Sequence, residues 1–195
     1  MTPKHIERIR KKITDIRKQL ANEKRKYGYY DDSRGRRYLP TTLYIQLGDY
    51  QGGITYLRWF DRNFPDDSGF PEFLFERMIL LFYAGKLQHA RQMAFRTFCR
   101  NPYWIDWFLG KPVVRYDIPE WANIAGSEYV THCIYHSSQT ELADFTEWLT
   151  ECVSDRDFAA KCNLWLDIQN RIKYETDDEK RRMLISEARH LQEES

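Results

Sequence analysis

The same arrangement of glycine, apolar residues and proline occurs twice in this chain, and the second copy follows the first after 37 residues. Gly48 precedes Pro65 by 17 residues, and Gly85 precedes Pro102 by 17 residues. In each copy one apolar stretch at helical spacing ends at the glycine, and a second runs on to the proline. Patterns that recur every 20 to about 50 residues are typical of stacked helix pairs, because a single pair cannot bury its own apolar face. We therefore expect an all-α fold.

The small residues of each copy predict how its helices end and pack. Gly48 and Gly85 stand where a first helix stops, and glycine can take the left-handed conformation that closes a helix. Gly53 and Ala90 stand where the second helix packs against the first, so a bulky side chain there would separate the two helices. The alternative is an ordinary helical bundle with two loops that look alike.

The residues of both copies resemble the tetratricopeptide repeat family. The family's order of large apolar, glycine, aromatic, small and proline positions is found at Leu43, Tyr44, Leu47, Gly48, Tyr50, Gly53, Leu57, Phe60 and Pro65, and again at Leu80, Leu81, Gly85, Leu87, Ala90, Phe98 and Pro102. The resemblance covers residues 38–103 and implies stacked helical hairpins. It also implies that the first helix of each copy lines a groove that binds a segment of a partner protein.

The resemblance implies a partner-binding groove that is mainly apolar and aromatic. Its residues would be Tyr38, Thr42, Ile45, Gln46, Phe75, Ile79 and Phe82. They lack the lysine and asparagine set with which tetratricopeptide domains bind a terminal carboxylate, so we expect an amphipathic helix as the occupant. That helix would come from a protein partner or from the chain's own N-terminal or C-terminal segment. The alternative is that these residues are plain core.

The N-terminal segment is strongly basic, although the whole chain has a net charge of only +1. Residues 1–38 contain 13 Lys or Arg and five Asp or Glu. Within them an apolar seam recurs at intervals of three and four, which predicts a helix over residues 3–26. The seam consists of Ile6, Ile9, Ile13, Ile16 and Leu20.

This basic helix needs a covering for its seam, and three coverings predict different functions. The helix packs on its own chain, pairs with its copy in a homodimer, or leaves its basic face free for nucleic acid or another anion. The candidate anion-binding residues are Arg8, Lys11, Lys12, Lys18, Arg34, Arg36 and Arg37. Tyr27, Tyr29 and Tyr30 follow the helix, and aromatic rings beside cations favour single-stranded nucleic acid.

Further helices are expected after the second copy, near residues 120–136, 139–152, 155–173 and 177–193. The last three are introduced by capping residues, which are Ser138, Ser154 and Thr176.

We expect the chain to consist of three segments. Residues 1–37 form the basic helix and connector, residues 38–110 form two hairpins, and residues 111–195 form C-terminal capping helices of the same domain.

The sequence contains no motif specific for catalysis, a cofactor or a metal. His132 and His136 are spaced as two ligands on one helical turn beside Cys133, but no third ligand is evident. The four cysteines lack CxxC pairs and are expected to be reduced, and no apolar run is long enough for a membrane helix. We expect a cytoplasmic, non-enzymatic protein-interaction module. The alternative is a nucleic-acid or anion binder that uses the basic helix.

Overall fold

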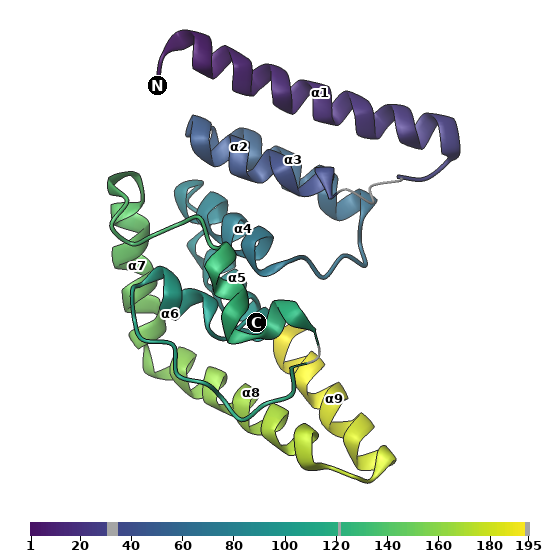
Figure 1. Cartoon of the computed structure of the whole chain (residues 1–195), viewed down its shortest axis with the longest axis vertical. Coiled ribbons are helices and arrows are strands. Elements are labelled where there is room, and N and C mark those ends of the chain that lie inside the picture. Colours follow the sequence, from purple (N-terminus) through teal and green to yellow (C-terminus); the bar gives the residue numbers. More distant parts are fainter. Residues whose placement is uncertain (31–34, 121, 194–195) are drawn as a thin grey trace. The chain divides into compact units, whose positions relative to one another are not determined.

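The computed structural model describes residues 1–30, 35–120 and 122–193, and in these ranges every regular element is a helix (Figure 1). The α-helices are α1 (Pro3–Tyr27), α2 (Leu39–Leu47), α3 (Tyr50–Asn63), α4 (Pro71–Tyr83), α5 (Leu87–Arg100), α6 (Trp104–Phe108), α7 (Ala143–Ser154), α8 (Arg156–Tyr174) and α9 (Asp178–Glu193). Short 3-10 turns are η1 (Arg36–Tyr38), η2 (Asn123–Ala125), η3 (Ser127–His132) and η4 (Thr140–Leu142). The predicted all-α class is confirmed.

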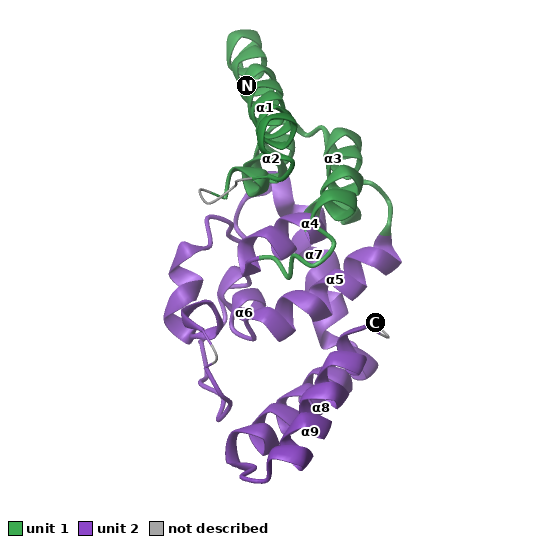
Figure 2. Cartoon of the chain, turned by 90° about the vertical axis from the view of Figure 1, so that its right-hand side faces the viewer, with its two compact units in different colours: residues 1–69, 79–86 green, residues 70–78, 87–195 purple. Residues whose placement is uncertain are grey.

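The chain forms two compact units, which are coloured separately in Figure 2. Unit 1 contains residues 1–69 and 79–86, and unit 2 contains residues 70–78 and 87–195. Helix α4 is shared, because its first part belongs to unit 2 and its last part to unit 1. The predicted segments 1–37, 38–110 and 111–195 do not coincide with these units.

The two copies of the sequence pattern adopt the same local structure. Helices α3 and α5 both have 14 residues, and their first residues, Tyr50 and Leu87, are 37 positions apart. Gly48 and Gly85 both have the predicted left-handed conformation, with φ of 67° and 73°. The hydrogen bonds of the two turns also repeat, with Gly48 N to Ile45 O, Asp49 N to Tyr44 O, Gly85 N to Phe82 O and Lys86 N to Leu81 O. The repeat therefore extends from residue types to turn geometry.

The apolar seam of α1 is covered by its own chain. Helix α1 begins with Pro3 in its first turn and ends at Gly28, whose φ is 79°. It lies along α2, and its seam residues Ile9, Ile13, Ile16 and Leu20 are buried. Intrachain packing is thus the covering that the structure has. A homodimer through α1 stays a prediction and would need another face of the helix.

Two adjacent glycines allow α3 to approach two neighbours within unit 1. A Cβ at Gly52 would lie 2.7 Å from Tyr44 Cε1 of α2, and a Cβ at Gly53 would lie 2.5 Å from Leu80 Cδ2 of α4. The prediction that Gly53 packs against the first helix of its own pair is therefore wrong by one residue. Gly52 makes that approach, while Gly53 faces the next helix along the chain.

Replacing Gly53 with valine should destabilise unit 1 by about 1–3 kcal/mol, because the added side chain overpacks a buried contact with Leu80. Denaturant unfolding followed by circular dichroism measures the change. Gln51→Val is the matched control, since Gln51 is exposed on the same helix. Equal losses for the two variants would show that helix propensity, and not the α3–α4 contact, is responsible.

The core of unit 2 is built around aromatic rings. Phe75 of α4 is fully buried, and its ring centroid lies 4.9 Å from that of Phe108, 5.6 Å from that of Phe145 and 5.9 Å from that of Tyr135. Helices α8 and α9 pack together through Ile168, Ile172, Leu184, Ala188 and Leu191. The predicted helices near 139–152, 155–173 and 177–193 are thus found as α7, α8 and α9.

The capping residues of α8 and α9 differ from the predicted ones by one position. Asp155, and not Ser154, accepts a hydrogen bond from Phe158 N at 3.0 Å. Asp177, and not Thr176, accepts hydrogen bonds from the amides of Glu179 and Lys180. A carboxylate at a helix N-terminus also interacts favourably with the helix dipole, which a hydroxyl does not.

The predicted helix over residues 120–136 is wrong, since η2 and η3 are 3-10 turns and residues 133–136 are not helical. The carbonyls that a helix would use are bound by a distant side chain. Asn101, which is fully buried, donates its side-chain amide to Ile124 O at 2.8 Å and to Gly126 O at 3.1 Å. Its side-chain oxygen accepts from Tyr103 N at 3.0 Å. Asn101 therefore holds this segment as a loop.

Asn101→Ala should destabilise unit 2 by about 2–4 kcal/mol, because a buried carbonyl, a half-buried carbonyl and a buried amide lose their partner. Thermal and denaturant unfolding measure the loss. The control is Asn123→Ala, at an exposed position in η2. Unchanged stability in Asn101→Ala would contradict a structural role for this side chain.

Candidate functional site

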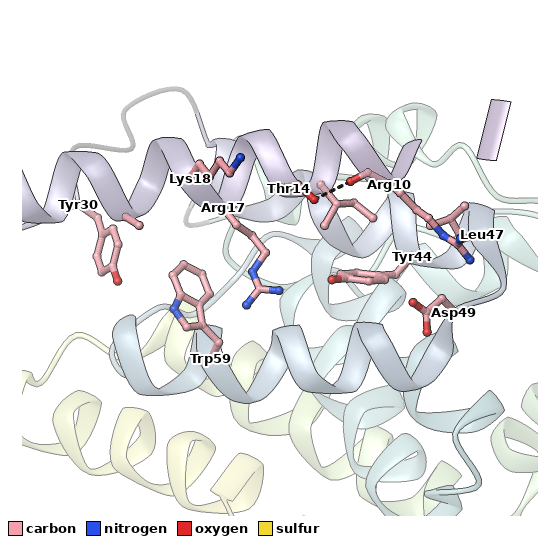
Figure 3. Close-up of a pocket in the computed structure, with 11 residues that line it drawn as sticks. Arg10, Thr14, Arg17, Lys18, Tyr30, Tyr44, Leu47, Asp49 and Trp59 are labelled. Atoms are coloured by element: carbon pink, nitrogen blue, oxygen red, sulfur yellow. Dashed lines mark hydrogen bonds between the residues drawn. The ribbon is translucent and has the colours of Figure 1, made fainter. Parts of the chain in front are cut away.

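A cleft of about 600 Å³ lies between α1 and the α2–α3 pair of unit 1 (Figure 3). Its lining residues are Arg10, Ile13, Thr14, Arg17, Lys18, Ala21, Tyr30, Tyr44, Leu47, Asp49 and Trp59. The burial of the α1 seam sets this geometry, because it fixes which side of α1 faces α3. Arg10, Thr14, Arg17 and Ala21 follow one another at intervals of four, three and four, which places them on one face of the helix.

Arg17 extends from α1 toward α3 in the middle of the cleft, between Tyr44 and Trp59 (Figure 3). Burial raises the pKa of Tyr44, while the nearby positive charge of Arg17 acts in the opposite direction. The positive charge of Arg17 thus lies near Tyr44 inside the cleft.

The cleft is cationic, because three basic residues line it and its one carboxylate already has a structural task. Asp49 caps α3 by accepting a hydrogen bond from Gly52 N at 2.9 Å. Among the described residues, neither Arg10 nor Lys18 forms a side-chain ion pair or hydrogen bond. Positive charge without an internal counter-charge is available to an anionic ligand.

An aromatic cluster forms one end of the cleft. The ring of Trp59 meets that of Tyr30 edge to face at 5.7 Å and that of Tyr56 at 5.3 Å. Tyr30 is also fixed by its hydroxyl, which donates to Asn63 Oδ1 at 2.8 Å. Trp59 and Tyr30 are both half-buried, so each ring keeps an accessible part in a fixed orientation.

The predicted anion-binding residues do not form one site. Lys18 lines the cleft described above, whereas Arg8, Lys11, Lys12 and Arg36 line a second cleft of about 520 Å³. Arg36 there forms an ion pair with Glu23 at 3.7 Å. Arg34 lies outside the described residues. Sequence reasoning missed Arg10, Arg17, Tyr44 and Trp59 as a group, although the spacing of seven between Arg10 and Arg17 already placed both on one helical face.

Arg37 and Tyr38 are joined to Asp67 in a separate network. Arg37 donates to Asp67 Oδ2 from Nε at 2.9 Å and from Nη2 at 2.8 Å, and the Tyr38 hydroxyl donates to the same oxygen at 2.7 Å. Gly69 N donates to Asp67 Oδ1 at 2.8 Å. The network ties η1 to the segment after α3, which indicates a structural role for Arg37.

The predicted groove residues differ in how far a partner can reach them. Phe75 and Ile79 are fully buried, and Tyr38 is half-buried in the Asp67 network. The accessible ones are Thr42, Ile45 and Gln46 on α2 and Phe82 near the end of α4, all in unit 1. A groove surface is therefore restricted to these four residues and the exposed part of Tyr38.

Tyr38 should make the stability of the chain depend on pH in alkaline solution. Burial first, and then the hydrogen bond to Asp67, raise its pKa from 10.0 to about 12. The unfolded chain loses this proton first, so the stabilisation by Tyr38 is complete below pH 10 and is lost as pH rises toward 12.

Tyr38→Phe should therefore cost about 1 kcal/mol of unfolding free energy below pH 10 and progressively less near pH 12. Denaturant unfolding of both chains across this range measures the difference, with the half-exposed Tyr27→Phe as control. A cost that does not change with pH would contradict the assigned hydrogen bond.

Two glutamates of α4 are hydrogen-bonded to tyrosines in unit 2. Tyr135 donates to Glu76 at 2.8 Å, and Tyr129 donates to Glu72 at 2.9 Å. Burial and the adjacent glutamate raise the pKa of both tyrosines. These tyrosines are therefore protonated donors at neutral pH, and the pairs tie residues 127–135 to α4.

His132 and His136 do not share a helical turn, because residues 133–136 are not helical. Across residues 1–30, 35–120 and 122–193, no three His, Cys, Asp or Glu side chains gather as a metal centre requires. Cys99, Cys133, Cys152 and Cys162 are free thiols. Burial raises the pKa of Cys133 and Cys162 to about 12 and that of Cys152 to about 11, and it raises the pKa of Cys99 well above its usual value.

Comparisons with protein-family models, with curated proteins and with solved structures find no significant match to this chain. In the part of the chain that the structure describes, no helix is both long enough and apolar enough to cross a bilayer. What the chain binds is therefore inferred from its own geometry.

Proposed function

We propose that this chain is a non-enzymatic protein-interaction module of the tetratricopeptide-like class. The observation that supports the proposal is the repetition of one turn between helices after 37 residues, with the same left-handed glycine and the same pair of turn hydrogen bonds. Repeated helical hairpins present extended surfaces for partners.

The contact between α3 and α4 also supports the class. Gly53 of α3 meets Leu80 of α4, and the rings of Tyr50, three residues earlier on α3, and Tyr83, three residues later on α4, stack at 4.5 Å. The order of these contacts is antiparallel, since residue 53 faces residue 80 and residue 50 faces residue 83. Stacked repeats are stabilised by such contacts between neighbouring repeats, and this one joins a helix of the first copy to a helix of the second.

The proposed partner is a helix or peptide of another protein, bound at the accessible groove residues of unit 1. Ile45 and Phe82 supply apolar surface, and Thr42 and Gln46 supply polar groups beside Ile45 on α2. Ile45 and Phe82 are 37 positions apart, so they occupy equivalent positions in the two copies. An amphipathic helix matches such a surface through its apolar face.

Affinity capture of host proteins on the immobilised full chain tests this function. Ile45→Glu should reduce the retained partner by about tenfold or more, because a charge would be buried in an apolar contact. Leu164→Glu is the matched control, since Leu164 is an exposed leucine of α8 in unit 2.

Circular dichroism and thermal unfolding establish that each variant keeps its fold. Partner retention that is equal for Ile45→Glu and the unmodified chain, or lost equally in Leu164→Glu, would overturn the groove assignment.

A further inference from the structure

The cleft between α1 and α3 combines two features that the proposed protein-binding groove does not have. It is lined by Arg10, Arg17 and Lys18 of α1, by the partly accessible ring of Trp59 on α3, and by the ring of Tyr30, which follows α1 (Figure 3). A ligand that fits this cleft engages both the charges and the rings.

The positive charges are arranged along the cleft and not at one point. Arg10 and Arg17 are seven residues apart on α1, which corresponds to about 10 Å along the helix. Lys18 follows directly at the rim, and Arg17 reaches between the rings (Figure 3). A ligand that engages all three must carry more than one negative charge along an extended chain.

The aromatic end of the cleft offers a ring that is already held in place. Trp59 contacts Tyr30 and Tyr56, so its orientation does not need to be fixed on binding. Its side chain lines the same cleft as Arg17 (Figure 3). A fixed aromatic ring next to a cation suits a ligand in which a flat ring and an anionic group are neighbours.

We propose that this cleft binds single-stranded nucleic acid, with a base stacked on Trp59 and successive phosphates at Arg17, Lys18 and Arg10. A duplex fits less well, because its bases are stacked on one another and do not reach a ring inside a cleft. An acidic peptide fits less well, because its carboxylates come without a flat ring to stack on Trp59, and Ile13 in the lining is buried. This inference does not depend on the protein-binding groove.

Fluorescence anisotropy with a labelled single-stranded oligouridylate tests the proposal on the full chain. Binding should weaken with salt, with a slope of log K against log salt of about −2, since three cations each contribute about −0.7 for a single strand. Arg17→Gln should lower the affinity about tenfold and make the slope smaller by about 0.7. Arg17→Lys should restore the slope.

Trp59 provides an independent readout. Trp59→Leu should weaken binding about 5- to 150-fold with the salt slope unchanged, because base stacking is lost while the phosphate contacts remain. Trp59→Phe should recover most of the affinity, since it keeps a ring for stacking.

Lys12→Gln is the matched charge control, because Lys12 lies on the same helix but lines the other cleft. It should change the affinity by less than about twofold. An equal loss for Lys12→Gln and Arg17→Gln would overturn the proposal, since it would indicate diffuse attraction to a basic helix.

Two competitors decide between ligand classes. Equal binding of a duplex of the same length, or displacement of the oligouridylate by an acidic peptide at lower concentration than by unlabelled oligouridylate, would also overturn the proposal. Circular dichroism of every variant separates loss of binding from loss of fold, and undetectable binding by a folded unmodified chain at low salt would exclude this ligand.

Discussion

The position of α4 beside α3 depends on the missing side chain at residue 53. Leu80 occupies the space that a Cβ would fill, and the stacked rings of Tyr50 and Tyr83 extend the same contact. Gly52 provides a second close approach, toward Tyr44 of α2. Adjacent glycines on one helix therefore bring two neighbouring helices close to it, and the seam of α1 is covered by packing along α2.

The placement of charge in unit 1 follows from the burial of apolar surface. Along its seam, helix α1 is held by apolar contacts, since the residues that it buries there are Ile9, Ile13, Ile16 and Leu20. Burying this seam turns Arg10 and Arg17 toward α3, whereas Arg8, Lys11 and Lys12 face the opposite cleft. Helix α1 thus has basic residues in two clefts, and the cleft that contains Arg10 and Arg17 also contains aromatic rings.

Much of the helix content was predictable from the sequence, because it depends on local chemistry. Glycine at Gly48 and Gly85, proline at Pro3 and Pro71, and regular apolar spacing fix α1 to α5 within a few residues. The loop over residues 120–136 was not predictable, since its conformation is imposed by Asn101, far away in the sequence.

The candidate site was predictable only in part, for the same reason. The basic face of α1 is a local property, whereas the meeting of Arg17 with Tyr44 and Trp59 requires three helices to pack first. For Arg37, in contrast, the sequence suggested an anion-binding residue where the structure has an internal ion pair. It belongs to the basic sequence, yet its charge is paired with Asp67, a partner thirty positions later in the chain.

Because the thiols are protected in the native state, the rate of their chemical modification measures local opening of the chain. A cysteine reacts with alkylating reagents as the thiolate, and in the native state all four groups hold their protons far above neutral pH. Modification at neutral pH therefore samples molecules that have transiently opened. Cys99, Cys152 and Cys162 lie on α5, α7 and α8, so the order in which they are modified would rank the local opening free energies of three helices without any introduced label.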